Sequence, residues 1–215
     1  MPATNPDLAI LVFAKAPVPG AAKTRLIPLL GAKQAAALQA RLLVRALATV
    51  SAAAPTRVEL WCAPDATHPA LIAAAQTYGA TLHVQQGDDL GARMAHAFTS
   101  ALQHASHVLC IGTDCPALTA QHLRDAAAAL RANHDAVFAP AEDGGYTLVG
   151  WSKNEPRLFE GIAWGTEHVM QQTRGRAQAC GLRWHELETL WDVDRPEDWR
   201  RLQQSGLLDE TPSTA

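Results

Sequence analysis

The sequence lacks a strong excess of charge of either sign. Its 215 residues include 18 Lys and Arg against 21 Asp and Glu, which gives a formal net charge of −3. A protein that binds nucleic acid through a broad basic surface carries a clear excess of lysine and arginine. The charge balance therefore excludes a polycationic nucleic-acid binder, and we expect any basic patch to be local.

Cysteine is scarce as well. The four cysteines, Cys62, Cys110, Cys115 and Cys180, form no C-x-x-C pair and have no spacing typical of a zinc site. This pattern predicts reduced and mostly buried thiols rather than a disulfide framework.

Long apolar runs are missing near the start of the chain. The early apolar run, residues 8–14, is too short to span a membrane, and it lacks the basic flank and small-residue cleavage site of a signal peptide. We therefore expect a cytoplasmic protein that does not use a membrane. The chain length suits one α/β domain over residues 1–215, with an ordered core at about 7–206.

What the sequence does contain is an alternation of strand and helix patterns. Residues 8–13 form a short apolar run before a Pro/Gly segment, as in a strand buried on both faces. Residues 32–50 carry leucines at helical spacing. Further strands are predicted near residues 57–62, 81–85, 107–112, 135–139, 146–150 and 182–187, and helices near 69–78, 90–105, 120–132, 166–178 and from 196. The alternation predicts an α/β fold, a Rossmann-like three-layer sandwich with a mostly parallel twisted sheet.

In such a sheet, ligands bind outside the carboxyl ends of the strands. The loop after the first strand contains Ala14, Lys15, Gly20, Lys23 and Arg25. Small residues let backbone amides approach a phosphate, and the three cations can neutralise it. The alternative is a solvated basic loop stiffened by two prolines.

Carboxylates follow two other predicted strands. Asp114 lies in Gly112-Thr113-Asp114-Cys115-Pro116, and both Asp192 and Asp194 precede the helix that begins near residue 196. Mg²⁺ takes one or two protein carboxylates together with substrate phosphates. We predict that Asp114 and Asp194 hold Mg²⁺ or Mn²⁺, with Asp192 as the alternative to Asp194. Asp114 and Asp194 could instead cap helices.

Two further segments are rich in glycine. Glu142-Asp143-Gly144-Gly145-Tyr146 allows unusual backbone angles and close approach of a ligand, although Asp-Gly is also a strong hairpin signal. The segment 87–93, with Gly91 and Arg93, could orient a nucleotide or could simply start a capped helix. We predict Asp143 as a catalytic residue and Gly91, Arg93, Gly144 and Gly145 as nucleotide-binding residues.

These motifs together resemble known families. Residues 22–26, Ala-Lys-Thr-Arg-Leu, resemble the A-K-S-R-L signature of 2-phospho-lactate guanylyltransferases, and residues 112–116 resemble the metal-binding G-D-x-P segment of related nucleotidyltransferases. Residues 143–147 are similar to the D-G-G-T segment of those guanylyltransferases, and residues 194–198 resemble the D-T-P-E-D run of sugar-nucleotide cytidylyltransferases. The whole pattern, over residues 8–200, resembles a bacterial family of uncharacterised nucleotide-diphospho-sugar transferases of the glycosyltransferase-A fold. One departure is the first loop, which has two prolines and the single glycine Gly20 in place of a compact G-x-G-x-R loop.

The resemblance implies a metal-dependent transferase that uses a nucleotide-activated substrate. In the leading hypothesis a phosphorylated small-molecule acceptor attacks a nucleoside triphosphate, and Mg²⁺, Lys15, Lys23 and Arg25 stabilise the departing pyrophosphate. In the second, the donor is a nucleotide sugar, and Asp143, Glu142 or Glu167 serves as the base for a hydroxyl acceptor. The third is a non-catalytic nucleotide-binding module. The residues select neither a nucleobase nor an oligomeric state.

Overall fold

The structure, a computed structural model, describes residues 5–208, and side chains from residue 7 onward. Its elements follow one another in nearly the predicted order. The strands are β1 (Asn5–Lys15), β2 (Pro55–Ala63), β3 (Thr81–Val84), β4 (His107–Gly112), β5 (Ala136–Pro140), β6 (Tyr146–Trp151) and β7 (Trp184–Glu186). The α-helices are α1 (Ile27–Leu30), α2 (Ala32–Ala52), α3 (Pro69–Tyr78), α4 (Leu90–Ala101), α5 (Ala120–Arg131), α6 (Val169–Ala179) and α7 (Pro196–Ser205), and two 3₁₀ turns cover Thr24–Leu26 and Pro156–Phe159.

The strands form one seven-stranded sheet in the order β3-β2-β1-β4-β6-β5-β7. All neighbouring pairs are parallel except the two that involve β6, which runs antiparallel to β4 and β5. A short connection joins β5 to β6, and only antiparallel neighbours can be joined by so short a turn. The predicted α/β fold with a mostly parallel sheet is therefore confirmed.

Strand β1 lies in the middle of the sheet and is buried on both faces. Leu8, Ile10 and Val12 belong to one apolar cluster, while Ala9 and Leu11 belong to another on the opposite face. This alternation explains why the strand is a continuous apolar run rather than an apolar–polar alternation.

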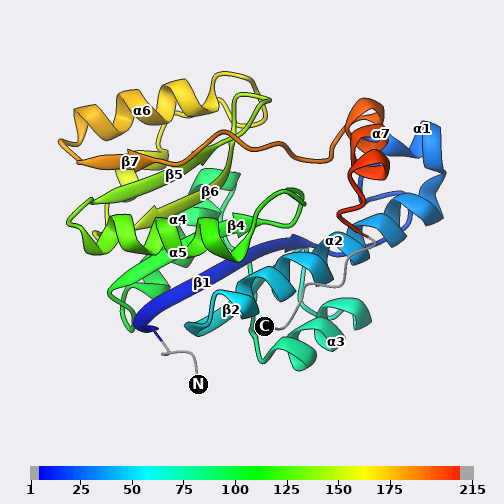
Figure 1. Cartoon of the computed structure of the whole chain (residues 1–215), viewed down its shortest axis with the longest axis horizontal. Coiled ribbons are helices and arrows are strands. Elements are labelled where there is room, and N and C mark those ends of the chain that lie inside the picture. Colours follow the sequence, from blue (N-terminus) through cyan, green and yellow to red (C-terminus); the bar gives the residue numbers. More distant parts are fainter. Residues whose placement is uncertain (1–4, 209–215) are drawn as a thin grey trace.

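Helices cover both faces of the sheet and complete the three layers. The first cluster includes side chains of α2, α3 and α5, and the second includes side chains of α4, α6 and the 3₁₀ turn at Pro156–Phe159. Figure 1 shows α2 and α5 in front of the strands and α4 behind them.

Helix α2 is the longest helix, and by length and composition alone it could cross a membrane. It has 21 residues, a mean hydropathy of 1.2, and half of its most apolar window buried inside the protein. Leu43, Leu47 and Val50 on this helix are in the core cluster with β1. These contacts are those of a core helix, whose apolar face is covered by the sheet.

A third, smaller cluster lies beyond the carboxyl end of β1. It joins Leu26 after the first loop, Leu38 and Leu42 of α2, Val193 of the late loop and Leu202 of α7. Figure 1 shows α7 next to α1 at this end of the molecule. The cluster brings the first loop and the segment near residue 193 together, although they are far apart in the sequence.

Candidate active site

A cleft lies among the loops that follow the strands. Its volume is about 940 Å³. The lining residues include six carboxylates and two arginines. They belong to the first loop, the β5–β6 turn, the segment before α6 and the segment around the start of α7. The full lining is Arg25, Glu142, Asp143, Gly144, Gly165, Thr166, Glu167, His168, Trp191, Asp192, Asp194, Arg195 and Asp198. The structure thus gathers three of the four predicted segments, and the cleft they line is acidic.

Lys23 lies beside this cleft, but its side chain is only 3% exposed. Its Nζ donates to the carbonyl oxygen of Val193 at 2.7 Å and forms an ion pair with Oδ1 of Asp114, also at 2.7 Å. The Val193 N–H donates to the Asp114 carbonyl oxygen at 2.8 Å. Lys23, predicted as a phosphate ligand, therefore links the first loop to Asp114 and to the segment before α7.

Asp114 follows β4, as predicted, and its side chain is 45% exposed. Helix α5 is capped instead by Thr119, whose side chain accepts from the His122 N–H. The alternative interpretation of Asp114 as a helix cap is therefore wrong, and its carboxylate is available to the site.

Asp192 is the most electrostatically perturbed carboxylate of the cleft. Burial, together with the negative charges of Asp143 and Asp114, raises its pKa to about 6, against a partial offset by Lys23. The charges of Asp143 and Asp114 therefore act on Asp192, and we call these three residues the acidic cluster.

Asp194, predicted as the second metal ligand, is engaged elsewhere. Its Oδ2 accepts from Nη1 of Arg25, and its N–H donates to Oδ2 of Asp198 at 3.1 Å. Asp198, in the first turn of α7, also accepts from the N–H of the N-cap residue Arg195 at 2.7 Å, and the N-cap position is thus not held by Asp194. The hydrogen bond and charge of Asp194 raise the pKa of Arg25, and Asp143 and Asp192 act in the same direction.

Glu142 is also paired. Its two carboxylate oxygens accept from the guanidinium of Arg201 at 2.7 and 3.2 Å, and this hydrogen bonding lowers the pKa of Glu142. The Arg201 guanidinium in turn lies 4.4 Å from the centre of the Trp191 ring. A carboxylate held in this way is a weak base.

The β5–β6 connection is a hairpin turn, as its alternative interpretation predicts. The Gly144 N–H donates to the Ala141 carbonyl, and Oδ1 of Asp143 accepts from the Gly145 N–H at 2.9 Å. A Cβ on Gly144, at φ +89°, would lie 2.1 Å from the carbonyl oxygen of Glu167. Gly144 thus allows the turn to contact the segment before α6, which brings Asp143 and Glu167 to the same cleft.

Residues 87–93 form a capped helix start, which is the alternative interpretation of this segment. Asp89 caps α4 by accepting from the Ala92 N–H at 2.7 Å, and Nε of Arg93 donates to the Gly87 carbonyl at 3.0 Å. A Cβ on Gly91 would lie 2.8 Å from the ring of Trp164. Gly91 and Arg93 have structural contacts here, and neither lines the cleft.

The remaining predicted residues lie along the first loop. Ala14 is buried within β1, Lys15 is the exposed last residue of that strand, and Gly20 has φ +87° in the exposed turn that follows. Lys15 is therefore the loop lysine that is accessible to a ligand.

The residues fit a divalent cation that is completed by a substrate. Within residues 5–208, no three His, Cys, Asp or Glu side chains are arranged to hold a metal ion by themselves. After burial and the charge of Asp143, the charge of Asp114 also raises the pKa of Asp192, and a bound cation would reduce this repulsion. Mg²⁺ and Mn²⁺ suit such a site, because phosphate and water supply their other ligands.

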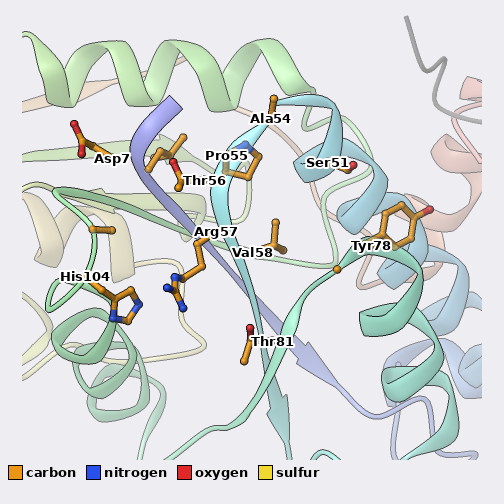
Figure 2. Close-up of a pocket in the computed structure, with 13 residues that line it drawn as sticks. Asp7, Ser51, Ala54, Pro55, Thr56, Arg57, Val58, Tyr78, Thr81 and His104 are labelled. Atoms are coloured by element: carbon orange, nitrogen blue, oxygen red, sulfur yellow. The ribbon is translucent and has the colours of Figure 1, made fainter. Parts of the chain in front are cut away.

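Another pocket, of about 460 Å³, lies at the opposite edge of the sheet (Figure 2). Asp7, Pro55 and Thr81, which line it, stand near the starts of β1, β2 and β3. Ligands of parallel sheets bind at the carboxyl ends, and the acidic cluster lies there too. The acidic cleft is accordingly the candidate active site.

Arg201 was not predicted from the sequence, and it reaches Glu142 of the cleft from α7. Residues 164–168, whose sequence suggests either a helix cap at Thr166 or the lining of an acceptor pocket, contribute Gly165, Thr166, Glu167 and His168 to the cleft. Gln39 lies under the site and donates to Oγ1 of Thr113 at 3.0 Å. A signal for Gln39 exists in the sequence, because it falls on the apolar stripe of α2 between Leu38 and Leu42.

Comparison with known proteins agrees with this fold. The family model described as "Uncharacterized protein conserved in bacteria (DUF2064)" matches residues 46–166. The crystal structure of a putative nucleotide-diphospho-sugar transferase from Desulfovibrio desulfuricans G20 is 31% identical in sequence, with a TM-score of 0.84 over 93% of this chain and 87% of that one. No curated protein matches the chain in sequence.

More distant structures share the fold. A Mycobacterium tuberculosis H37Rv protein crystallised with manganese is 18% identical, with a TM-score of 0.60 over 93% of this chain and 99% of that one. The 4-diphosphocytidyl-2C-methyl-D-erythritol synthase of Anaerococcus prevotii DSM 20548 is 12% identical, with a TM-score of 0.63 over 93% and 97%. The fold is thus that of the nucleotide-diphospho-sugar transferases.

Proposed function

Because the chain belongs to the DUF2064 family of proteins conserved in bacteria, and because it carries an acidic cleft at the carboxyl edge of its sheet, we propose that it is a metal-dependent transferase that acts on a nucleotide-activated substrate. The observation that carries the proposal is the acidic cluster of Asp114, Asp143 and Asp192. Its position at the carboxyl ends of the strands is where nucleotide ligands bind in open α/β sheets.

Asp114 and Asp192 are the proposed metal-binding pair. Asp192 is preferred to Asp194, because Asp194 is already neutralised by Arg25, whereas the charge of Asp114 acts on Asp192 directly. When bound, Mg²⁺ or Mn²⁺ supplies Lewis-acid stabilisation of the phosphates of the substrate. Lys15, exposed at the end of β1, is the loop cation proposed to contact those phosphates.

The charges of the cleft favour transfer of a sugar from a nucleotide sugar to a hydroxyl acceptor. Two of the three cations assigned to pyrophosphate are already paired, Lys23 with Asp114 and Arg25 with Asp194. The cleft itself contains six carboxylates and only two arginines. A dianionic phosphorylated acceptor would be repelled there, whereas a neutral hydroxyl acceptor would not.

In this reaction the acceptor oxygen bonds to the anomeric carbon, the bond from that carbon to the phosphate oxygen breaks, and a nucleoside diphosphate leaves. The hydroxyl proton goes to a carboxylate. Glu142 is unsuited because Arg201 holds it and lowers its pKa. Asp143 and Glu167 both line the cleft, and Asp143 is the proposed base because it lies within the acidic cluster.

Nucleotidyl transfer from a nucleoside triphosphate is the second candidate. It is supported by the structural likeness to a 4-diphosphocytidyl-2C-methyl-D-erythritol synthase and by the exposed Lys15 after β1. In that reaction a phosphorylated acceptor attacks the α-phosphate, and pyrophosphate leaves. An ionised phosphate nucleophile needs no base, so the reaction would not depend on Asp143.

Ligand-dependent stabilisation tests the proposal. The purified chain is melted with nucleoside triphosphates or nucleoside diphosphate sugars, with and without Mn²⁺, and bound nucleotides are then followed by chromatography. A ligand at 100 times its Kd adds about 2.7 kcal/mol of stability, which raises the Tm by about 5–10 °C in a chain of this size.

We expect this shift with a nucleotide sugar, only when Mn²⁺ is present, and slow release of nucleoside diphosphate. Asp192→Asn, which removes a proposed metal ligand without breaking an ion pair found within residues 5–208, is the matched control and should weaken the shift without lowering the Tm of the free protein. Pyrophosphate release from a triphosphate would favour the second candidate. Metal-independent binding, or no nucleotide binding, would refute the transferase proposal.

A further inference from the structure

Three polar side chains are buried directly beneath Asp114. Counted as whole residues, Lys23 is 8% exposed, and Gln39 and Thr113 are each 4% exposed. Buried polar groups are costly unless they are hydrogen-bonded, so their partners indicate what they do. They come from three elements that only the folded chain brings together: the first loop, α2 and the end of β4.

Their hydrogen bonds converge on one oxygen atom. Oδ1 of Asp114 accepts from Nζ of Lys23 at 2.7 Å and from Oγ1 of Thr113 at 3.1 Å. Oγ1 of Thr113 in turn accepts from Nε2 of Gln39 at 3.0 Å. Within residues 5–208, each of the hydrogen bonds found for this carboxylate is made to Oδ1, and 45% of the side chain is exposed.

Lys23 also fixes the second part of the site. Its Nζ binds the carbonyl oxygen of Val193, and the Val193 N–H binds the carbonyl oxygen of Asp114. Val193 separates Asp192 from Asp194, so the same ammonium restrains both the Asp114 carboxylate and the backbone that carries Asp192. Lys23 adopts a left-handed backbone conformation, with φ 48° and ψ 47°, which is uncommon for a residue with a side chain.

We propose that Lys23 and Thr113 are positioning residues that hold Oδ1 of Asp114, so that Oδ2 is the oxygen presented to a divalent cation. The inference rests on the proposed function, because it concerns the metal site of that function. It replaces contact with the phosphates as the role of Lys23. A carboxylate whose orientation is already fixed loses less conformational freedom when it binds a metal, and outer partners of this kind commonly change metal affinity by 10- to 100-fold.

An effect of charge and an effect of positioning predict opposite changes in Mn²⁺ affinity when Lys23 is replaced. Removing a cation 2.7 Å from Asp114 would, by charge alone, make the site more negative and tighten the binding of Mn²⁺. Removing a restraint would leave Asp114 and the backbone at Val193 free to move and would weaken binding. The direction of the change therefore separates the two roles.

The experiment measures the Kd for Mn²⁺ alone, by the electron paramagnetic resonance signal of free Mn²⁺, on the full chain without nucleotide. The variants are Lys23→Met and Thr113→Val. Lys33→Met, at an exposed position in the first turn of α2, makes the same change in net charge away from the site. Thr113→Ser keeps the hydroxyl and serves as the conservative counterpart of Thr113→Val.

We expect Lys23→Met and Thr113→Val to raise the Kd about tenfold or more, with Lys33→Met and Thr113→Ser within about twofold of the wild type. Thr113→Val conserves side-chain shape, so it tests the inference even if Lys23→Met does not fold. Unchanged or tighter Mn²⁺ binding by folded Lys23→Met, or unchanged binding by Thr113→Val, would overturn the inference while the proposed function stands. Absence of Mn²⁺ binding by the wild type would instead refute the metal site and both proposals with it.

Discussion

Replacing Asp192 with asparagine should make the metal-free protein more stable and should weaken its metal site. The ionised side chain of Asp192 is partly buried, next to the charges of Asp143 and Asp114. Asparagine has a similar shape but carries no charge. It would therefore relieve the burial of a charge and the repulsion within the cluster, at the cost of a metal ligand.

The magnitude follows from the pKa. In the folded protein the pKa of Asp192 is about 6, against an ordinary value of 3.8. A difference of about 2 pKa units corresponds to roughly 3 kcal/mol, which is an upper value for the cost of the ionised group. Partial contact with water screens the charges, so we expect Asp192→Asn to gain about 1–2 kcal/mol at pH 8, or about 3–6 °C in Tm.

The sign of the pH dependence is fixed. Above pH 6, Asp192 is ionised in both states, and the folded state alone bears the cost. Below about pH 3 the carboxyl is largely protonated in both states, so the cost disappears. The stability difference between variant and wild type should therefore increase from about pH 3 to pH 6 and stay constant above pH 7.

Urea unfolding followed by the fluorescence of the six tryptophans measures this difference at each pH. Saturating Mn²⁺ should stabilise the wild type more than the variant, because it binds the folded wild type more tightly. A variant that is less stable than the wild type at pH 8, or a difference that is the same at pH 4 and pH 8, would refute the electrostatic reasoning.

Gly144→Ala should lower the free energy of unfolding by more than about 2 kcal/mol, because the new Cβ would lie 2.1 Å from the Glu167 carbonyl oxygen. Gly165→Ala, at φ +77° with nothing within 4 Å of its Cβ, should cost only about 1 kcal/mol, and equal losses in Tm would contradict the steric argument. Asp143→Asn should lower kcat for sugar transfer by about 100- to 10,000-fold, as for loss of a general base. Glu142→Gln should change kcat by less than about tenfold, and steady-state kinetics showing the reverse order would make Glu142 the base.

Much of the fold could be predicted from local sequence patterns. The apolar runs predict the strands, because a strand that is covered on both faces needs apolar side chains at every position, as in β1. The helical spacing of leucines gave α2 because a single face of that helix is buried. Exact ends were less predictable: α4 ends at Ala101 rather than near Ala105, and α6 begins at Val169 rather than near Thr166.

The general position of the site could be predicted as well, since carboxyl ends of parallel strands meet at one edge of a sheet. Residues after β1, β4 and β5 were therefore candidates before their contacts were known. Gly91 and Arg93 were selected on the same rule, and their contacts with Trp164 and Gly87 are structural. The sequence pattern of a helix start after a strand is the same whether its polar residues cap the helix or bind a ligand.

The sequence by itself determined that this chain forms a parallel α/β sheet with cations and carboxylates at one edge, because periodicity and strand order are local properties. Only the tertiary structure decided which charges meet. Asp192 and Asp194 are two residues apart, so the sequence pattern places them on the same side and does not choose between them. Arg25 neutralises Asp194, and Lys23 is buried against Asp114 and Val193. Those partners lie up to 170 residues away along the chain, where no local pattern can pair them.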